Sequence, residues 1–107
     1  KVRSKSEVII ANLLFEHKIE YEYEQKLYYD IGKWIEPDFT IHLSSGLDLY
    51  WEHLGMLGTE SYDKRWLEKL EIYKNSYPNQ LIKTYEGSTI TDAALDLISS
   101  FVTRESV

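Results

Sequence analysis

The sequence of 107 residues contains no cysteine, which excludes disulfide bonds and thiolate zinc sites. Its three histidines, His17, His42 and His53, are not spaced like a set of metal ligands. No apolar run reaches the roughly eighteen residues that a membrane helix requires, and the N-terminus lacks the apolar core of a signal peptide. We therefore expect a soluble protein of a reducing, cytoplasmic compartment that makes no contact with a membrane.

Basic residues are scarce, because 12 lysines and arginines stand against 18 aspartates and glutamates and the net charge is −6. This is the wrong sign for a module that holds nucleic acid by its overall electrostatic field. The charge therefore argues against tight, autonomous binding of DNA. It does not argue against a nuclease, since a carboxylate metal site is itself acidic and other parts of a larger protein could hold the strand.

The composition is typical of one folded domain, with 43% hydrophobic and 28% charged residues. A chain of this length supports one hydrophobic core and is too short for two. We therefore expect a single domain over residues 1–107. Because the first residue is Lys1 rather than methionine, and a helix begins almost at once, we also expect this domain to belong to a longer polypeptide.

Hydrophobic periodicity predicts an α/β fold with the order helix, three strands, helix, strand, helix. The predicted ranges are residues 4–17, 19–24, 34–43, 47–53, 60–77 and 80–85, followed by a helix that begins at Thr89 or Thr91. Residues 30–33 are a connection, and the turn at residues 44–46 predicts an antiparallel hairpin. The strand after the long helix can return parallel to the third strand, which predicts a mixed four-stranded sheet flanked by helices.

The first helix combines two signals. Ser4 followed by Glu7 forms a capping-box pattern, in which each side chain binds the other residue's backbone N–H. The run VIIANLLF that follows is apolar almost all round, so we expect this helix to be largely buried.

The strongest chemical signal is the pairing of PDFTI (37–41) with YWEHLG (50–55), one on each arm of the predicted hairpin. Alternation places Asp38 opposite in direction to Phe39, and Glu52 opposite to Trp51, so both carboxylates can reach one small volume. Two carboxylates held close together repel, and burying them usually requires a bound cation or a shared proton. Oxygen ligands favour Mg²⁺ or Mn²⁺, which can activate water for phosphodiester hydrolysis.

Five motifs follow one another in the predicted element order: RSKSE (3–7), YEYE (21–24), PDF (37–39), WEHLG (51–55) and YDKRWLEK (62–69). In this order the sequence resembles the PD-(D/E)xK nuclease superfamily, and more narrowly the nuclease domains attached to some superfamily-one DNA helicases. The resemblance covers nearly the whole chain. It implies a restriction-endonuclease-like core, a magnesium-dependent deoxyribonuclease activity in DNA repair, and DNA and helicase or other domains of the parent chain as partners.

Carried over to this sequence, the resemblance makes Asp38 and Glu52 metal ligands, with the backbone carbonyl of His53 as a third and Glu7 adding to the metal's shell. The sequence departs from the family at Leu54, where a lysine is usual, because leucine can neither polarise a phosphate nor orient a water.

In some members the lysine comes from the neighbouring helix, and Lys69 is the candidate here. It lies on the helical face whose aromatic side chains should pack toward the sheet. Arg65 is the reserve, because a guanidinium can also stabilise charge on a phosphate.

Each assignment has a plainer alternative. Glu7 can serve only the Ser4 cap, Asp38 can be a strand-entry residue after a proline, and Lys69 can pair with acidic neighbours such as Glu68 on its own helix. At the level of function, the alternatives are a nuclease-like module that no longer cleaves and serves in DNA binding or coupling, and a glycosidase that uses the Asp38 and Glu52 pair.

Overall fold

The computed structural model describes residues 4–105, with side chains described as far as residue 101. The elements are α1 (Lys5–Glu16), β1 (Glu20–Tyr23), β2 (Leu27–Asp30), β3 (Lys33–Ile35), β4 (Phe39–His42), β5 (Asp48–Leu54), α2 (Glu60–Ser76), β6 (Leu81–Tyr85) and α3 (Ile90–Glu105). The predicted order of helices and main strands is confirmed. One short strand, β2, is additional, and the second strand of the prediction is divided into β3 and β4.

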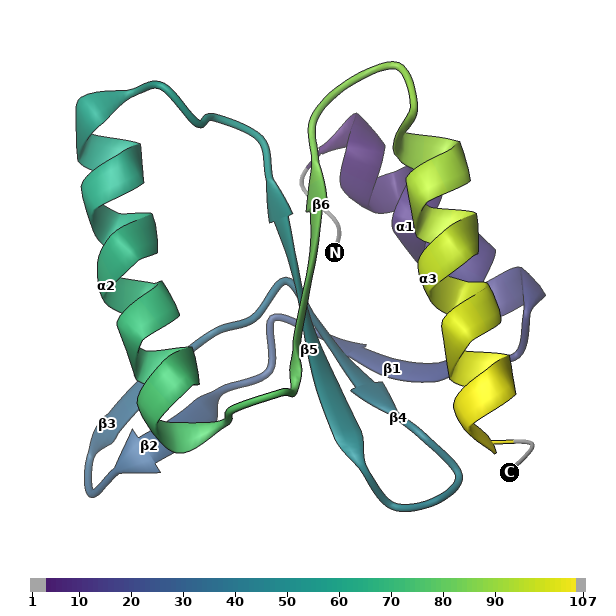
Figure 1. Cartoon of the computed structure of the whole chain (residues 1–107), viewed down its shortest axis with the longest axis horizontal. Helices are drawn as coiled ribbons and strands as arrows, with labels where there is room; N and C mark the ends of the chain where they lie inside the picture. The colour runs from purple at the N-terminus through teal and green to yellow at the C-terminus, as the bar shows by residue number, and fades with distance from the viewer. Residues whose placement is uncertain (1–3, 106–107) are drawn as a thin grey trace.

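The main sheet has four strands in the order β1-β4-β5-β6 (Figure 1). The pairs β1/β4 and β4/β5 are antiparallel, and β6 lies parallel to β5. The mixed four-stranded sheet and its hairpin are therefore confirmed. α2 provides the crossover from β5 to β6, because parallel neighbours require a connection long enough to return along the sheet.

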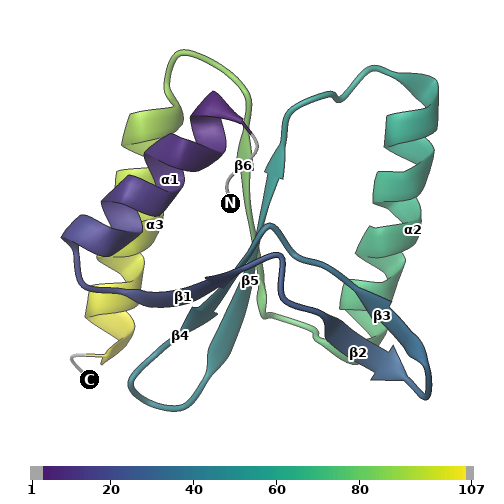
Figure 2. The same cartoon turned by 180° about the vertical axis from the view of Figure 1, so that it is seen from behind.

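Helices cover both faces of the sheet, α2 on one side and α1 with α3 on the other (Figures 1 and 2). Neighbouring residues of β5 show this directly, since Tyr50 stacks on Tyr73 of α2 while Trp51 meets Phe101 of α3 edge to face. β5 is therefore buried on both faces, and its residues 49–54 are all buried.

The hydrophobic core lies between the sheet and the pair α1 and α3. Its members are Ile10, Ala11, Leu14, Phe39, Ile41, Leu43, Leu49, Trp51, Ile90, Ala94, Ile98 and Phe101. The opposite face, under α2, carries Tyr50 and Glu52 with the aromatic and basic side chains of that helix. The sheet thus separates an apolar layer from a layer in which polar groups are buried.

The predicted strand over residues 34–43 is wrong in one respect, because it is broken in two. β3 ends at Ile35 and β4 begins at Phe39. Pro37 lies in the break and is fully buried. Proline has no backbone N–H to donate to a ladder, which explains why regular pairing ends here.

β2 and β3 form a separate two-stranded hairpin that the periodicity did not predict. Its turn falls within residues 30–33, where a connection was expected, and Gly32 adopts the left-handed conformation there with φ of 69°. Tyr77, at the end of α2, donates its hydroxyl hydrogen to the carbonyl of Tyr28 and so connects the hairpin to α2.

α1 begins as predicted, since the Glu7 backbone N–H donates to the Ser4 hydroxyl at 3.2 Å. The expectation that this helix is largely buried is wrong for one side. Val8 and Phe15 are 42% and 79% exposed, because only the face that carries Ile10 and Leu14 meets the core. Within the described residues, no helix is both long and apolar enough to cross a membrane.

Candidate functional site

A cavity of about 520 Å³ is lined by residues of α2, of the carboxyl end of β5 and of the start of α1. Glu7, Asp38, Glu52 and Lys69, the four side chains that the sequence analysis selected as catalytic, all line it. They come from α1, the β3–β4 connection, β5 and α2, so the fold brings together residues up to 62 positions apart. The fold therefore gathers these four side chains at one cavity.

Asp38, directly before β4, and Glu52 of β5 both face the cavity. The antiparallel register pairs Phe39 with Trp51, so one step further along the hairpin Asp38 lies opposite Glu52. Side chains directly opposite on an antiparallel pair have Cβ atoms about 5 Å apart. The predicted convergence of the two carboxylates therefore follows from the register.

Pro37 and Asp38 together change how the end of β5 is hydrogen-bonded. The backbone pairs of this hairpin recur at every second residue, since Leu43 N–H donates to Leu47 O and the register continues through the pair Phe39 and Trp51. The next pair is Pro37 and His53. Pro37 has no N–H, so the His53 carbonyl has no backbone donor opposite it.

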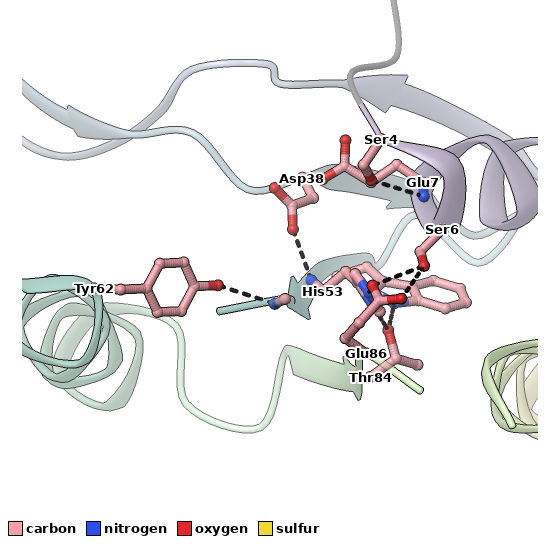
Figure 3. A network of polar contacts seen from close by, with 10 residues as sticks. Ser4, Ser6, Glu7, Asp38, His53, Tyr62, Thr84 and Glu86 are labelled. Carbon is pink, nitrogen blue, oxygen red and sulfur yellow. Dashed lines mark hydrogen bonds and ion pairs between the residues drawn. The ribbon is translucent and has the colours of Figure 1, made fainter. Parts of the chain in front are cut away.

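The His53 N–H is satisfied in another way, because it donates to Asp38 Oδ2 at 2.6 Å (Figure 3). The side chain of Asp38 thus replaces the backbone acceptor at the end of the ladder. This bond fixes the orientation of the Asp38 carboxylate beside Glu52. With its N–H bound to Asp38 and no backbone donor opposite its carbonyl, His53 can offer this carbonyl oxygen, and not its ring, to a cation beside Asp38.

Glu52 is held from α2 by two groups. Lys69 Nζ lies 2.8 Å from Glu52 Oε2, and the Tyr73 hydroxyl donates to the same oxygen at 2.5 Å. Lys69 also donates to the backbone carbonyl of Glu36 at 2.9 Å. Lys69 therefore reaches across to the sheet and does not pair with the acidic residues of its own helix.

Glu7 reaches the cavity from α1. Its carboxylate accepts a hydrogen bond of 2.7 Å from the Tyr23 hydroxyl, and its side chain lines the cavity. The Ser4 hydroxyl caps the Glu7 backbone, but the Glu7 side chain is bound to Tyr23. The plainer alternative, in which Glu7 serves only the helix cap, is therefore not the arrangement observed.

Burial and neighbouring charges raise the pKa values of the two facing carboxyl groups. Burial and the neighbouring Glu52 raise the pKa of Asp38 to about 7, although the His53 N–H opposes this. Burial also raises the pKa of Glu52, and the positive charge of Lys69 opposes that shift, while Glu7 adds to it. The site therefore concentrates negative charge that water cannot reach freely, and a cation would relieve it.

The His53 side chain belongs to a different network on the other face of β5 (Figure 3). Its Nδ1 lies 2.8 Å from Thr84 Oγ1 and its Nε2 lies 2.9 Å from Glu86 Oε1. Trp51 Nε1 donates to the same Thr84 oxygen at 3.0 Å, so the Thr84 hydroxyl connects the indole to the imidazole.

Glu86 extends this network to α1, because both of its carboxylate oxygens accept from the Ser6 hydroxyl, at 2.8 and 3.0 Å. The hydrogen bonds from His53 and Ser6 lower the pKa of Glu86. The network connects the ends of β5 and β6 to the first turn of α1, where Glu7 follows Ser6. It holds the backbone on which the cavity carboxylates depend.

The donors fit a hard divalent cation in their chemistry. Within the described residues, the hydrogen bonds and ion pair of the two facing carboxylates fall on Asp38 Oδ2 and Glu52 Oε2, which leaves one oxygen on each. The His53 carbonyl adds a third oxygen, and Mg²⁺ and Mn²⁺ prefer oxygen ligands. In the described part of the chain, no three histidine, cysteine or acidic side chains form a metal-ligand group, so Glu7 does not complete one in this arrangement.

The structure adds residues that the sequence analysis did not select for the site. Tyr73 is one, and its signal was present, because it follows Lys69 by four residues and therefore shares its helical face. Tyr62 and Trp66 also line the cavity with Arg65, at the same helical spacing. Thr84 and Glu86 had no comparable signal, since their partners lie more than 30 residues away.

The sequence matches no known protein family, and no solved structure is significantly similar to it. It is 46% identical over 78 residues to the uncharacterized protein MJ1519 of Methanocaldococcus jannaschii. The similar segment is 71% of this chain, and the chain spans 6% of the length of that relative. A segment of this kind therefore also occurs within a much longer archaeal protein whose function is not described.

Proposed function

We propose that this chain is a metal-dependent DNA nuclease domain with a restriction-endonuclease-like core of the PD-(D/E)xK type. The observation that supports it most is the convergence of Asp38, Glu52 and Lys69 on one cavity, from a hairpin and from the crossover helix. The mixed sheet with its order β1-β4-β5-β6 is compatible with that core. We propose Mg²⁺ or Mn²⁺ as its metal and DNA as its substrate.

The residues of the chain have distinct roles in it. Asp38, Glu52 and the His53 carbonyl would hold Mg²⁺ or Mn²⁺, and Glu7, which lines the same cavity, would support the metal from beside them. When bound, the cation supplies a Lewis acid for the phosphate and lowers the pKa of a coordinated water. Lys69 carries its positive charge next to Glu52, where it orients that carboxylate and stabilises negative charge on the phosphate.

The comparison with the archaeal relative supports a role within a larger protein. That relative contains the similar segment as 6% of its length. The net charge of −6 also favours a domain that receives its strand from other parts of a longer chain. We propose a helicase or another DNA-processing unit as that neighbour, in the cytoplasm.

The proposal is tested by incubating the purified chain with labelled single-stranded and duplex DNA in Mg²⁺, Mn²⁺ or EDTA. We expect cleavage that requires the metal and falls at least a hundredfold in Asp38→Ala and in Glu52→Ala. Asp48→Ala is the matched control, because Asp48 is an acidic residue at the other end of the same hairpin, paired with His42. Full activity in both cavity variants would overturn the proposal.

The second candidate is a nuclease-like module that binds or couples without cleaving. Buried Leu54, 4% exposed, favours it, because this side chain lines the cavity where the family usually has a lysine. Calorimetric titration with Mn²⁺ separates the two candidates. An inert module shows no Mn²⁺ binding that depends on Asp38 and Glu52, whereas the nuclease does.

A further inference from the structure

The wall of the cavity opposite the carboxylates is formed by α2. Four of its side chains line the cavity: Tyr62, Arg65, Trp66 and Lys69. Their spacing of three, four and seven residues from the first places them on one face of the helix. Aromatic rings and positive charges therefore face the site where we propose that a phosphate is cleaved.

Two side chains of this wall, Arg65 and Trp66, make no contact with the described part of the chain that shows a role in stabilising the fold. Lys69 is bound to Glu52, and the Tyr62 hydroxyl accepts from the Gly55 N–H at 3.3 Å (Figure 3). Within the described residues, Arg65 makes no ion pair or hydrogen bond, and Trp66 makes no hydrogen bond or ring contact. A partly buried indole and an unpaired guanidinium at the edge of one cavity are suited to a ligand that has both a flat ring and an anion.

We propose that this wall is a binding subsite for one unpaired nucleotide, whose base stacks on Trp66 and whose phosphate is held by Arg65. This inference rests on the proposed nuclease function and adds its substrate class, which is single-stranded DNA. A base can stack on a side chain only after it has left the stack of a duplex. The subsite therefore selects a strand that is already unpaired.

The size and charge of the site favour the same substrate. A cavity of about 520 Å³ is in the range that encloses one small ligand, and a duplex is far wider. Arg65 and Lys69 are the basic residues that line it, and the chain as a whole is acidic. Duplex binding depends on many phosphate contacts along a basic surface, whereas one stacked base with one or two phosphate contacts does not.

Binding is measured without cleavage, by fluorescence anisotropy of a labelled oligothymidine in EDTA, against a labelled hairpin duplex of the same length. We expect the single strand to bind more tightly. Trp66→Ala weakens its binding about tenfold, and Trp66→Phe restores most of it. Arg65→Gln also weakens it and lowers the dependence of binding on salt by about one phosphate contact.

Two controls are matched to these variants. Trp34→Ala removes an exposed tryptophan from the separate β2–β3 hairpin, and Lys64→Gln removes the exposed charge that precedes Arg65 on α2. Both leave single-strand binding unchanged. Thermal unfolding and the Mn²⁺ affinity are followed in every variant, so that a fold defect in Trp66→Ala is recognised and the Trp66→Phe and Arg65→Gln results still decide.

The outcomes separate this inference from the nuclease proposal. If cleavage depends on Asp38 and Glu52 but Trp66→Ala and Arg65→Gln bind the single strand as the unmodified chain does, the subsite is wrong and the nuclease stands. Tighter binding of the duplex also overturns the subsite. If binding depends on Trp66 and no metal-dependent cleavage occurs, the nuclease proposal fails and the single-strand subsite remains.

Discussion

Lys69 of α2 forms an ion pair of 2.8 Å with Glu52 of β5. The nuclease family that we propose for this chain has a lysine two residues after the second carboxylate, and this chain has buried Leu54 there. The positive charge of the site therefore comes from the crossover helix. Only 5% of the Glu52 side chain is exposed, so this pair interacts in surroundings that screen it less than water does.

Replacing Lys69 with methionine should lower the rate of DNA cleavage by about a hundredfold or more, since a charge that stabilises the reacting phosphate is lost. Binding of Mn²⁺ should be retained, because Asp38 and Glu52 remain. The comparison is with Lys64→Met, which changes an exposed lysine on the same helix. An equal rate for both variants would show that Lys69 has a structural role only.

Asp38→Asn should stabilise the metal-free chain at alkaline pH. Burial and Glu52 raise the pKa of Asp38 from 3.8 to about 7, so between these values the folded chain holds a proton that the unfolded chain releases. The free energy of unfolding therefore falls as the pH rises from about 4 to about 7 and stays low above that. Asparagine removes this loss.

The expected gain is on the order of 2 kcal/mol at pH 8 and close to zero at pH 4. Urea unfolding in EDTA at several pH values measures it, and Glu22→Gln on the exposed side of β1 is the control. A variant that is less stable than the unmodified chain at pH 8 would contradict the loss of stability that we attribute to ionised, buried Asp38.

Tyr73→Phe should destabilise the chain by about 1–3 kcal/mol, because it removes the donor of a 2.5 Å hydrogen bond to a buried carboxylate. Tyr50→Phe is the matched control. Tyr50 is 5% exposed and stacks on Tyr73, but its hydroxyl makes no hydrogen bond within the described residues. Chemical unfolding of the two variants compares them, and equal losses would mean that the bond to Glu52 contributes no more than a buried hydroxyl without this partner.

Pro37→Ala should weaken Mn²⁺ binding roughly tenfold, by analogy with changes to groups that support metal ligands. Alanine restores a backbone N–H at the position that faces His53 in the hairpin ladder. That N–H can bind the His53 carbonyl and withdraw it from a cation. Calorimetry measures the affinity, with Pro78→Ala beyond the end of α2 as the control. Unchanged affinity in Pro37→Ala would remove the His53 carbonyl from the proposed ligands.

Part of this protein could be predicted from its sequence because the relevant patterns are local. Strand alternation determined that Asp38 and Phe39 point to opposite faces, and that Glu52 and Trp51 do so too. The helical spacing of Lys69 with its aromatic neighbours predicted a face turned toward the sheet. These properties depend on the geometry of one element, so they are the same whichever element packs against it.

The tertiary structure decided what those faces meet. The break at Pro37 interrupts the run 34–43, in which polar and apolar residues alternate regularly. The hydrophobic pattern does not show that the proline lacks a backbone N–H. The sequence left Glu7 between a helix cap and the site, and the position of β1 against α1 gives it Tyr23 as its partner. Lys69 could equally have paired along its own helix, and it pairs with Glu52 because α2 lies across the face of β5 that carries this carboxylate. Contacts between residues this far apart in sequence depend on how the elements pack, which no local pattern contains.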